Sequence, residues 1–198
     1  MEKQVGFTLI EISIVLVIIG LLLGGVLKGQ ELIENAKIKR MNNDFSGIAS
    51  ATYSYLDRYS AIPGDDINAA TRWPAAGSVP AAVSPTTSTG ALDTPAKVAN
   101  FWDHLRRSNL IVGGIGTDLP VHAFGGVISV ADGYLKITGP VICMDNINGK
   151  RAEIIDRQLD DGKPDSGTLR ATSGTLGTGA TGDTVYTEST KYSICKQM

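Results

Sequence analysis

The densest group of acidic side chains in the sequence comprises Asp160, Asp161 and Asp165. Calcium binds several oxygen ligands, so these carboxylates form a candidate calcium site. However, the segment lacks the alternating aspartates of an EF-hand loop, and no glutamate follows at the closing position. Gly162 and Pro164 are typical of a tight turn at the end of a helix. We therefore predict a turn with no cofactor, and keep calcium as the alternative.

Residues that could support catalysis are few. The only two histidines, His104 and His122, lie outside any HExxH motif, and the sequence contains no GxSxG motif and no phosphate-binding loop. We expect both histidines to be structural or surface residues and the protein not to be an enzyme. The net charge of −2 gives no electrostatic footprint for general nucleic-acid binding.

The two cysteines, Cys143 and Cys195, are too far apart for a CxxC motif, which would indicate zinc binding or dithiol redox chemistry. In an exported protein such a pair favours one disulfide, and in a cytosolic protein it favours two buried thiols. The choice between them depends on where the N-terminal segment sends the chain.

A single charged residue, Glu11, interrupts the apolar run from Phe7 to Leu27. As a helix this run is about 31 Å long, which matches the hydrocarbon thickness of a bilayer. A carboxylate in hydrocarbon costs several kcal/mol unless it is paired, so Glu11 is a candidate functional residue. The alternative is a carboxyl group at the membrane surface, either hydrated or protonated.

An ordinary secretory signal peptide fits this segment poorly. Signal peptides place a small-residue cleavage site after the apolar stretch. Here Gly6 precedes that stretch, and Gly24 and Gly25 near its end lack the alanine spacing of a usual cleavage site.

The leader MEKQVG followed by FTLIE resembles the signal of type IV prepilins and type II secretion pseudopilins. The resemblance implies that a prepilin peptidase cleaves between Gly6 and Phe7, and that the new amine of Phe7 is then methylated. It also implies that Glu11 pairs with the Phe7 amine of a neighbouring subunit during assembly. The implied partners are other copies of this chain or related pilins, the peptidase, the membrane and an inner-membrane assembly platform.

The resemblance implies a single-pass protein of the bacterial inner membrane, with a cytoplasmic N-terminus and a periplasmic head, that later enters a filament. The positive-inside rule points the other way, because Lys28, Lys37, Lys39 and Arg40 follow the span and only Lys3 precedes it. We give the leader motif more weight, since the peptidase acts at the cytoplasmic face. Export then predicts a disulfide between the two cysteines.

The chain divides into four predicted regions: a cleaved leader (1–6), a transmembrane or filament-core helix (7–28), the amphipathic half of the same helix (29–62) and a globular head (63–198). An apolar stripe of Ile33, Met41, Phe45, Ile48, Thr52, Tyr55 and Tyr59 predicts that the helix continues to Tyr59. The head should contain a surface loop (73–94), helices at 95–109 and 150–159, a hairpin of strands 127–130 and 134–138, and further strands at 140–144, 168–171 and 192–195.

These elements predict an α+β fold in which a long N-terminal helix packs on a small antiparallel sheet. The function that this organisation favours is a structural subunit of a type IV pilus or pilus-like filament. The alternatives are a type II secretion pseudopilin, a minor pilin, or a single-pass anchored domain that binds a ligand outside the cytoplasm.

Overall fold

A computed structural model describes residues 8–76, 80–173 and 182–198. The first element is the helix α1, Leu9–Tyr59, which ends where Ser60 adopts a positive φ of 51°. The Ile62-Pro63-Gly64 segment follows, and proline disfavours helical geometry in the residue before it. The predicted end of the helix at Tyr59 is confirmed. The chain forms two compact units, Met1–Lys39 and Arg40–Met198, so α1 contributes to both.

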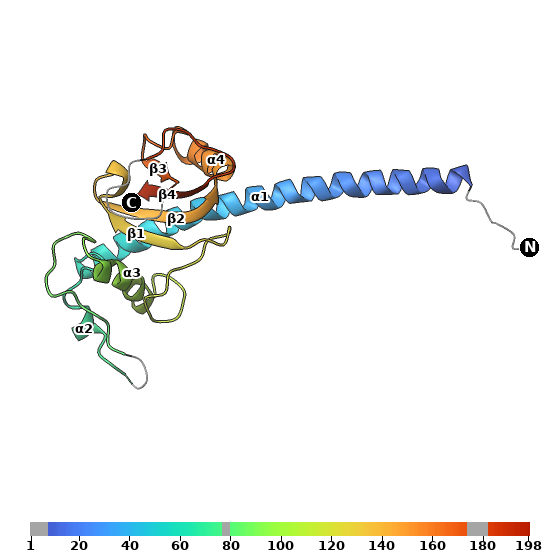
Figure 1. Cartoon of the computed structure of the whole chain (residues 1–198). Coiled ribbons are helices and arrows are strands. Elements are labelled where there is room, and N and C mark those ends of the chain that lie inside the picture. Colours follow the sequence, from blue (N-terminus) through green and yellow to red (C-terminus); the bar gives the residue numbers. More distant parts are fainter. Residues whose placement is uncertain (1–7, 77–79, 174–181) are drawn as a thin grey trace, which may run out of the picture. The chain divides into compact units, whose positions relative to one another are not determined.

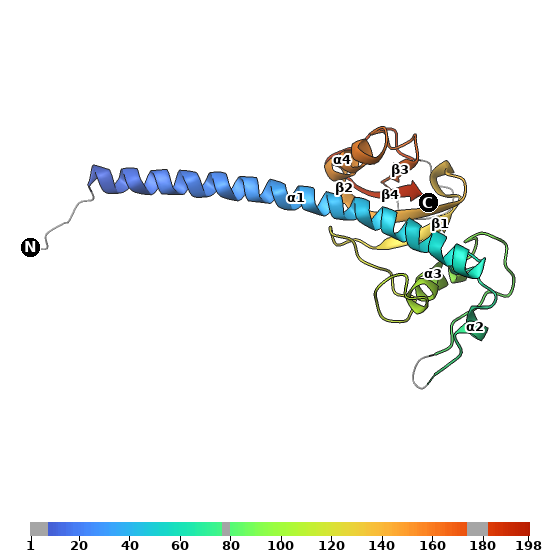
Figure 2. The same cartoon turned by 180° about the vertical axis from the view of Figure 1, so that it is seen from behind.

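In the second unit, the predicted apolar stripe of α1 forms part of the core. Its first predicted residue, Ile33, lies in the first unit and is 59% exposed, so the prediction is wrong there. Met41, Phe45, Ile48, Thr52 and Tyr55 are all buried. This part of α1 runs along one face of the sheet, as the front and back views show (Figures 1 and 2). The spacing of three and four residues explains why one side of the helix faces the core.

The residues that the structure describes form a sheet of four antiparallel strands in the order β1-β2-β4-β3. The strands are β1 (Ile128–Asp132), β2 (Pro140–Asn148), β3 (Leu169–Thr172) and β4 (Lys191–Gln197). The last strand in chain order therefore lies inside the sheet, between β2 and β3. The small antiparallel sheet and the long N-terminal helix confirm the predicted α+β fold.

The predicted hairpin of 127–130 with 134–138 is wrong. Residues Tyr134–Lys136 form a 3₁₀ helix, η1, and β1 pairs with β2 instead. Leu135 and Lys136 have positive φ values of 53° and 61°, which no regular strand allows. The N–H of Gly133 donates to the carbonyl of Gly139, closing the connection between β1 and β2 at 3.0 Å. Burial of Tyr134, Leu135 and Ile137 in the core accompanies this conformation.

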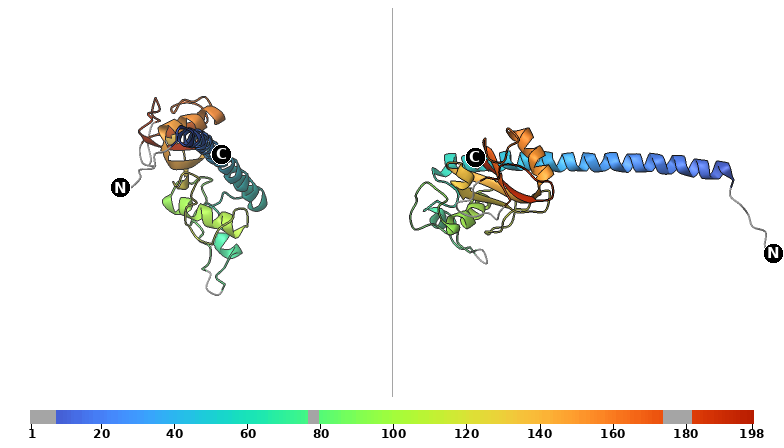
Figure 3. Two further views of the ribbon diagram at one scale, coloured as in Figure 1. Left: turned by 90° about the vertical axis from the view of Figure 1, so that its right-hand side faces the viewer. Right: turned by 45° about the horizontal axis from the view of Figure 1, so that its top comes forward.

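Three further helices lie in the described part of the head. The short helix α2 (Ala69–Arg72) was not predicted, whereas α3 (Pro95–Arg107) and α4 (Gly149–Leu159) lie where periodicity placed them. The hydroxyl of Thr94 caps α3, and the side chain of Asn148 caps α4. α3 packs against β1, and α4 packs against β2, β3 and β4. In two views, α2, α3 and residues 80–94 before α3 lie together on one side of the sheet (Figures 1 and 3).

Candidate assembly site

The first unit presents an apolar helical surface. Between Leu9 and Leu27, its large apolar side chains are exposed, from 46% at Ile19 to 90% at Leu9. Among the described residues, α1 is the one helix long and apolar enough to cross a membrane, judged by length and composition. Water would make such a surface costly, so it must be covered by lipid or by other protein.

Glu11 lies in the first turn of this helix and bonds with Thr8. The backbone N–H and the hydroxyl of Thr8 donate to Oε2 of Glu11 at 2.8 and 2.7 Å. In return, the N–H of Glu11 donates to the Thr8 hydroxyl oxygen at 3.3 Å. This reciprocal pattern is a capping box, and it satisfies N–H groups that the start of a helix leaves without partners.

The sequence interpretation singled out Glu11 but missed Thr8. The signal was available, because Thr8 and Glu11 have the S/T-x-x-E spacing of a capping box just before an apolar run. Gly6 and Phe7, the predicted cleavage and methylation residues, lie outside the described residues. Their predicted roles, and the pairing of Phe7 with Glu11, stay predictions.

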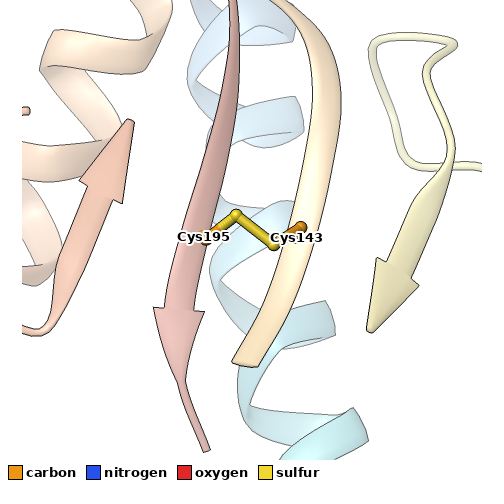
Figure 4. The surroundings of a disulfide bond; sticks show 2 residues. All are labelled: Cys143 and Cys195. Atoms are coloured by element: carbon orange, nitrogen blue, oxygen red, sulfur yellow. A yellow bond between two sulfur atoms is a disulfide. The ribbon is translucent and has the colours of Figure 1, made fainter. Parts of the chain in front are cut away.

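Cys143 on β2 and Cys195 on β4 form a disulfide. They are directly opposed in the antiparallel register, with their Cα atoms 4.0 Å apart, and both are fully buried. Figure 4 shows the bond bridging the two strands, with α1 passing behind them. The sulfurs belong to a core cluster that includes Tyr134, Leu135 and Ile137. The disulfide expected of an exported chain is therefore present in the head.

The acidic group found in the structure differs from the one picked out in the sequence. Carboxylate oxygens of Asp156, Asp160 and Asp161 lie within 4.8 Å of one another, and Asp165 is not part of the group. Burial raises the pKa of the Asp156 carboxyl to about 6, and the nearby charges of Asp161 and Asp160 add to the rise. Asp156 was missed because its position on α4 looks like an ordinary helix residue in the sequence.

Each carboxylate of this group already has donors from the protein. Asp160 accepts the backbone N–H groups of Thr168 and Leu169, the latter at 2.8 Å. Asp161 accepts the N–H of Lys163 at 3.0 Å and the hydroxyl of Ser166 at 2.6 Å. These bonds organise the chain between α4 and β3, as expected of a turn.

The fully buried Asp156 is tied in the same way. It accepts the N–H of Gly162 at 3.2 Å and the hydroxyl of Tyr186 at 2.7 Å.

The turn also requires a glycine at position 167. Gly167 has a positive φ of 74°, and a Cβ there would stand 1.9 Å from Oδ2 of Asp160.

Comparison with known families identifies the N-terminal segment. Residues 1–27 match the model of the prokaryotic N-terminal methylation motif. No curated protein and no solved structure matches the chain. Proteins that carry this motif are structural subunits rather than enzymes. Together with the long apolar helix, the motif fits a membrane-anchored protein that later enters a filament. The chain thus carries the signal shared by type IV pilins and type II secretion pseudopilins, and this signal supports its place among type IV pilin-like proteins.

Proposed function

We propose that this protein is a structural subunit of a type IV pilus or pilus-like filament, assembled through its N-terminal helix. The observation that carries the proposal is the exposed apolar surface of Leu9–Leu27, which lies within the residues that match the methylation motif. In the membrane, lipid covers this surface. In a filament, the same surface packs against the helices of neighbouring copies, which replaces lipid contacts with helix contacts.

Processing precedes assembly in this proposal. A prepilin peptidase at the inner membrane removes residues 1–6, and the exposed amine of Phe7 is methylated. The head then lies in the periplasm, where its disulfide is stable. An inner-membrane assembly platform extracts the subunit and adds it to the growing filament.

Glu11 sets the register of each added subunit. The ammonium group of Phe7 and the carboxylate of Glu11 are each costly in an apolar environment, and pairing them between neighbouring copies offsets both desolvation costs. A membrane anchor that never leaves the bilayer needs neither the cleavage nor the carboxylate.

Intact mass measurement of the protein from its natural host, with electron microscopy of sheared filaments, tests the proposal. We expect a mass that corresponds to residues 7–198 plus about 14 Da for one methylation. We also expect the protein in filaments. A chain that still begins at Met1, in a host with an active prepilin peptidase, would contradict the proposal. Correct processing with no filament would leave a pseudopilin or minor pilin as the better assignment.

A further inference from the structure

His104 on α3 connects two segments that are distant in the sequence. The imidazole is fully buried. Its Nδ1 accepts a hydrogen bond from the backbone N–H of Gly64 at 2.9 Å, and its Nε2 lies 2.9 Å from the carbonyl oxygen of Val83. A carbonyl can only accept, so Nε2 carries the proton and Nδ1 does not. The ring is therefore neutral in this arrangement.

Asp65, the residue after Gly64, makes a second set of contacts that hold the loop before α3 in place. Its carboxylate accepts the Ser88 hydroxyl at 2.8 Å and the Gly90 N–H at 2.7 Å, and it pairs with the buried Lys97 of α3 at 2.7 Å. A Cβ at Gly64 would stand 2.1 Å from the carbonyl oxygen of Lys97, so the turn lies directly on α3. Displacing Gly64 from His104 therefore also displaces the anchor of residues 88–90.

Protonation of His104 would remove the first of these links. A hydrogen on Nδ1 would face the N–H of Gly64, so that a donor would meet a donor. The positive charge would also have no access to water. Burial lowers the pKa of His104 below its ordinary value.

The groups around the ring only partly compensate a charge. The Val83 carbonyl, Asp66 in the turn and Asp103 on α3 favour the charged form, and Arg107 on α3 opposes it. Tyr55 of α1 stacks on the imidazole at 6.2 Å and donates its hydroxyl to Asp66 at 2.7 Å. Asp66 also pairs with Arg72, and Asp103 pairs with Arg107, so both carboxylates already have cationic partners.

We propose that His104 is an acid-sensitive latch, whose protonation releases from α3 the turn at Gly64 and, with it, residues 88–90. The latch is closed when the ring is neutral and opens when both ring nitrogens carry protons. It does not depend on the proposed role in a filament. Its effect is to change the surface of the head as the medium becomes acidic.

The direction of the pH dependence follows from the depressed pKa. When the turn is released, the pKa of His104 lies near its ordinary value of about 6.5, and in the closed head it is lower. The closed form keeps its full stability above pH 6.5 and loses it as the pH falls toward the pKa of the closed form. In that interval the opening equilibrium rises about tenfold for each pH unit.

His122 provides a matched control elsewhere in the head. It is also buried, with Nε2 2.8 Å from the carbonyl oxygen of Asp145 and Nδ1 accepting the N–H of Phe124 at 3.3 Å. It faces Asp44 and Asp145, and it holds the turn before β1 rather than the loop on α3. Its substitution should leave the pH response of Gly64 and of residues 88–90 unchanged.

The test is hydrogen exchange of the full-length protein in detergent micelles between pH 7 and pH 5, corrected for the intrinsic exchange rate. We expect protection of the Gly64, Thr89 and Gly90 amides to fall about tenfold per pH unit below 6.5. His104→Gln offers an acceptor and a donor that do not titrate, and it should abolish this dependence. His122→Gln should retain it.

Unchanged protection in the wild type at pH 5, or the same pH response in His104→Gln, would overturn the latch. If the amides of His104→Gln are already unprotected at pH 7, the deciding measurement is the titration of the wild-type His104 imidazole, monitored by NMR. A titration midpoint that coincides with the loss of amide protection supports the latch, and a midpoint that does not coincide refutes it.

Discussion

At the scale of single residues, only one carboxylate oxygen of Glu11 is used within its own helix. Its Oε2 accepts both bonds from Thr8, and its Oε1 accepts no hydrogen bond from any residue that the structure describes. One oxygen therefore completes the start of its own helix. The other is available for the ammonium group of a neighbouring copy, so capping and the proposed pairing are compatible.

Glu11→Leu should separate membrane insertion from assembly. The substitution makes the span more apolar, so insertion and leader cleavage should stay largely intact. Filament yield should fall strongly, because the Phe7 amine of the neighbour is left unpaired in an apolar environment. The measurement is the ratio of sheared filament to membrane-bound mature subunit.

Thr8→Ala is the matched control for this experiment. It removes the capping hydroxyl and keeps the carboxylate, so filaments should still form. A normal filament yield from Glu11→Leu would rule out the pairing. An equal loss in both variants would show that capping, rather than pairing, is what assembly requires.

The acidic turn after α4 allows a second test at this scale. Asp160→Ala leaves the N–H groups of Thr168 and Leu169 without their acceptor, and should cost about 1–3 kcal/mol of folding free energy. Because protein donors occupy these carboxylates, we expect the same melting temperature in calcium and in EDTA. Asp165→Ala, at an exposed position outside the group, should change neither quantity. A calcium-dependent rise in melting temperature that Asp160→Ala abolishes would establish the calcium alternative.

At the scale of secondary-structure elements, the helices α1, α3 and α4 were predictable, whereas the short helix α2 and the connection after β1 were not. The stripe from Met41 to Tyr55 repeats at helical spacing, and Pro95 begins α3, so these features are local. The segment Tyr134–Thr138 is rich in strand-forming residues, yet it forms η1 because its side chains fill the core over the disulfide. Tertiary burial outweighed local propensity there.

In the candidate site, too, some residues could be predicted from local sequence and others could not. Glu11 is conspicuous because a charge interrupts an apolar run, and the motif in residues 1–27 identifies its context. The place of Asp156 in the acidic group could be recognised only in the structure, where Tyr186 and the turn after α4 contact it. Contacts between residues so far apart depend on the packing of the whole head, which no local pattern encodes.

The disulfide should be a major contribution to the stability of the sheet. The bond joins residues 52 positions apart, and loop-closure entropy gives about 4 kcal/mol for such a ring. Cys143→Ala with Cys195→Ala should therefore lower the free energy of unfolding in urea by a comparable amount. Thiol labelling of the unfolded, unreduced protein is the control, since two reactive thiols would show that the bond is absent.

At the scale of the whole molecule, the two units differ in what covers their apolar residues. The second unit, Arg40–Met198, buries its own core, whereas the large apolar side chains between Leu9 and Leu27 in the first unit are exposed. Removing residues 1–27 should therefore abolish membrane association and leave the unfolding free energy of the head nearly unchanged. Urea denaturation of the truncated chain and of the full chain in mild detergent makes the comparison. A large loss of stability on truncation would show that the head depends on the apolar segment.

Because β4 lies inside the sheet, the sheet can be completed only after residue 197 has left the ribosome or the export channel. Before then, β2 and β3 lack the neighbour that they share, and β1 with β2 is a two-stranded hairpin, which is marginally stable alone. Cys143 also lacks its partner during this interval. In the proposed function the head crosses the membrane, and a sheet that is completed only at the end keeps the chain unfolded enough to be translocated. Oxidation of the two cysteines on the far side would then stabilise the completed sheet.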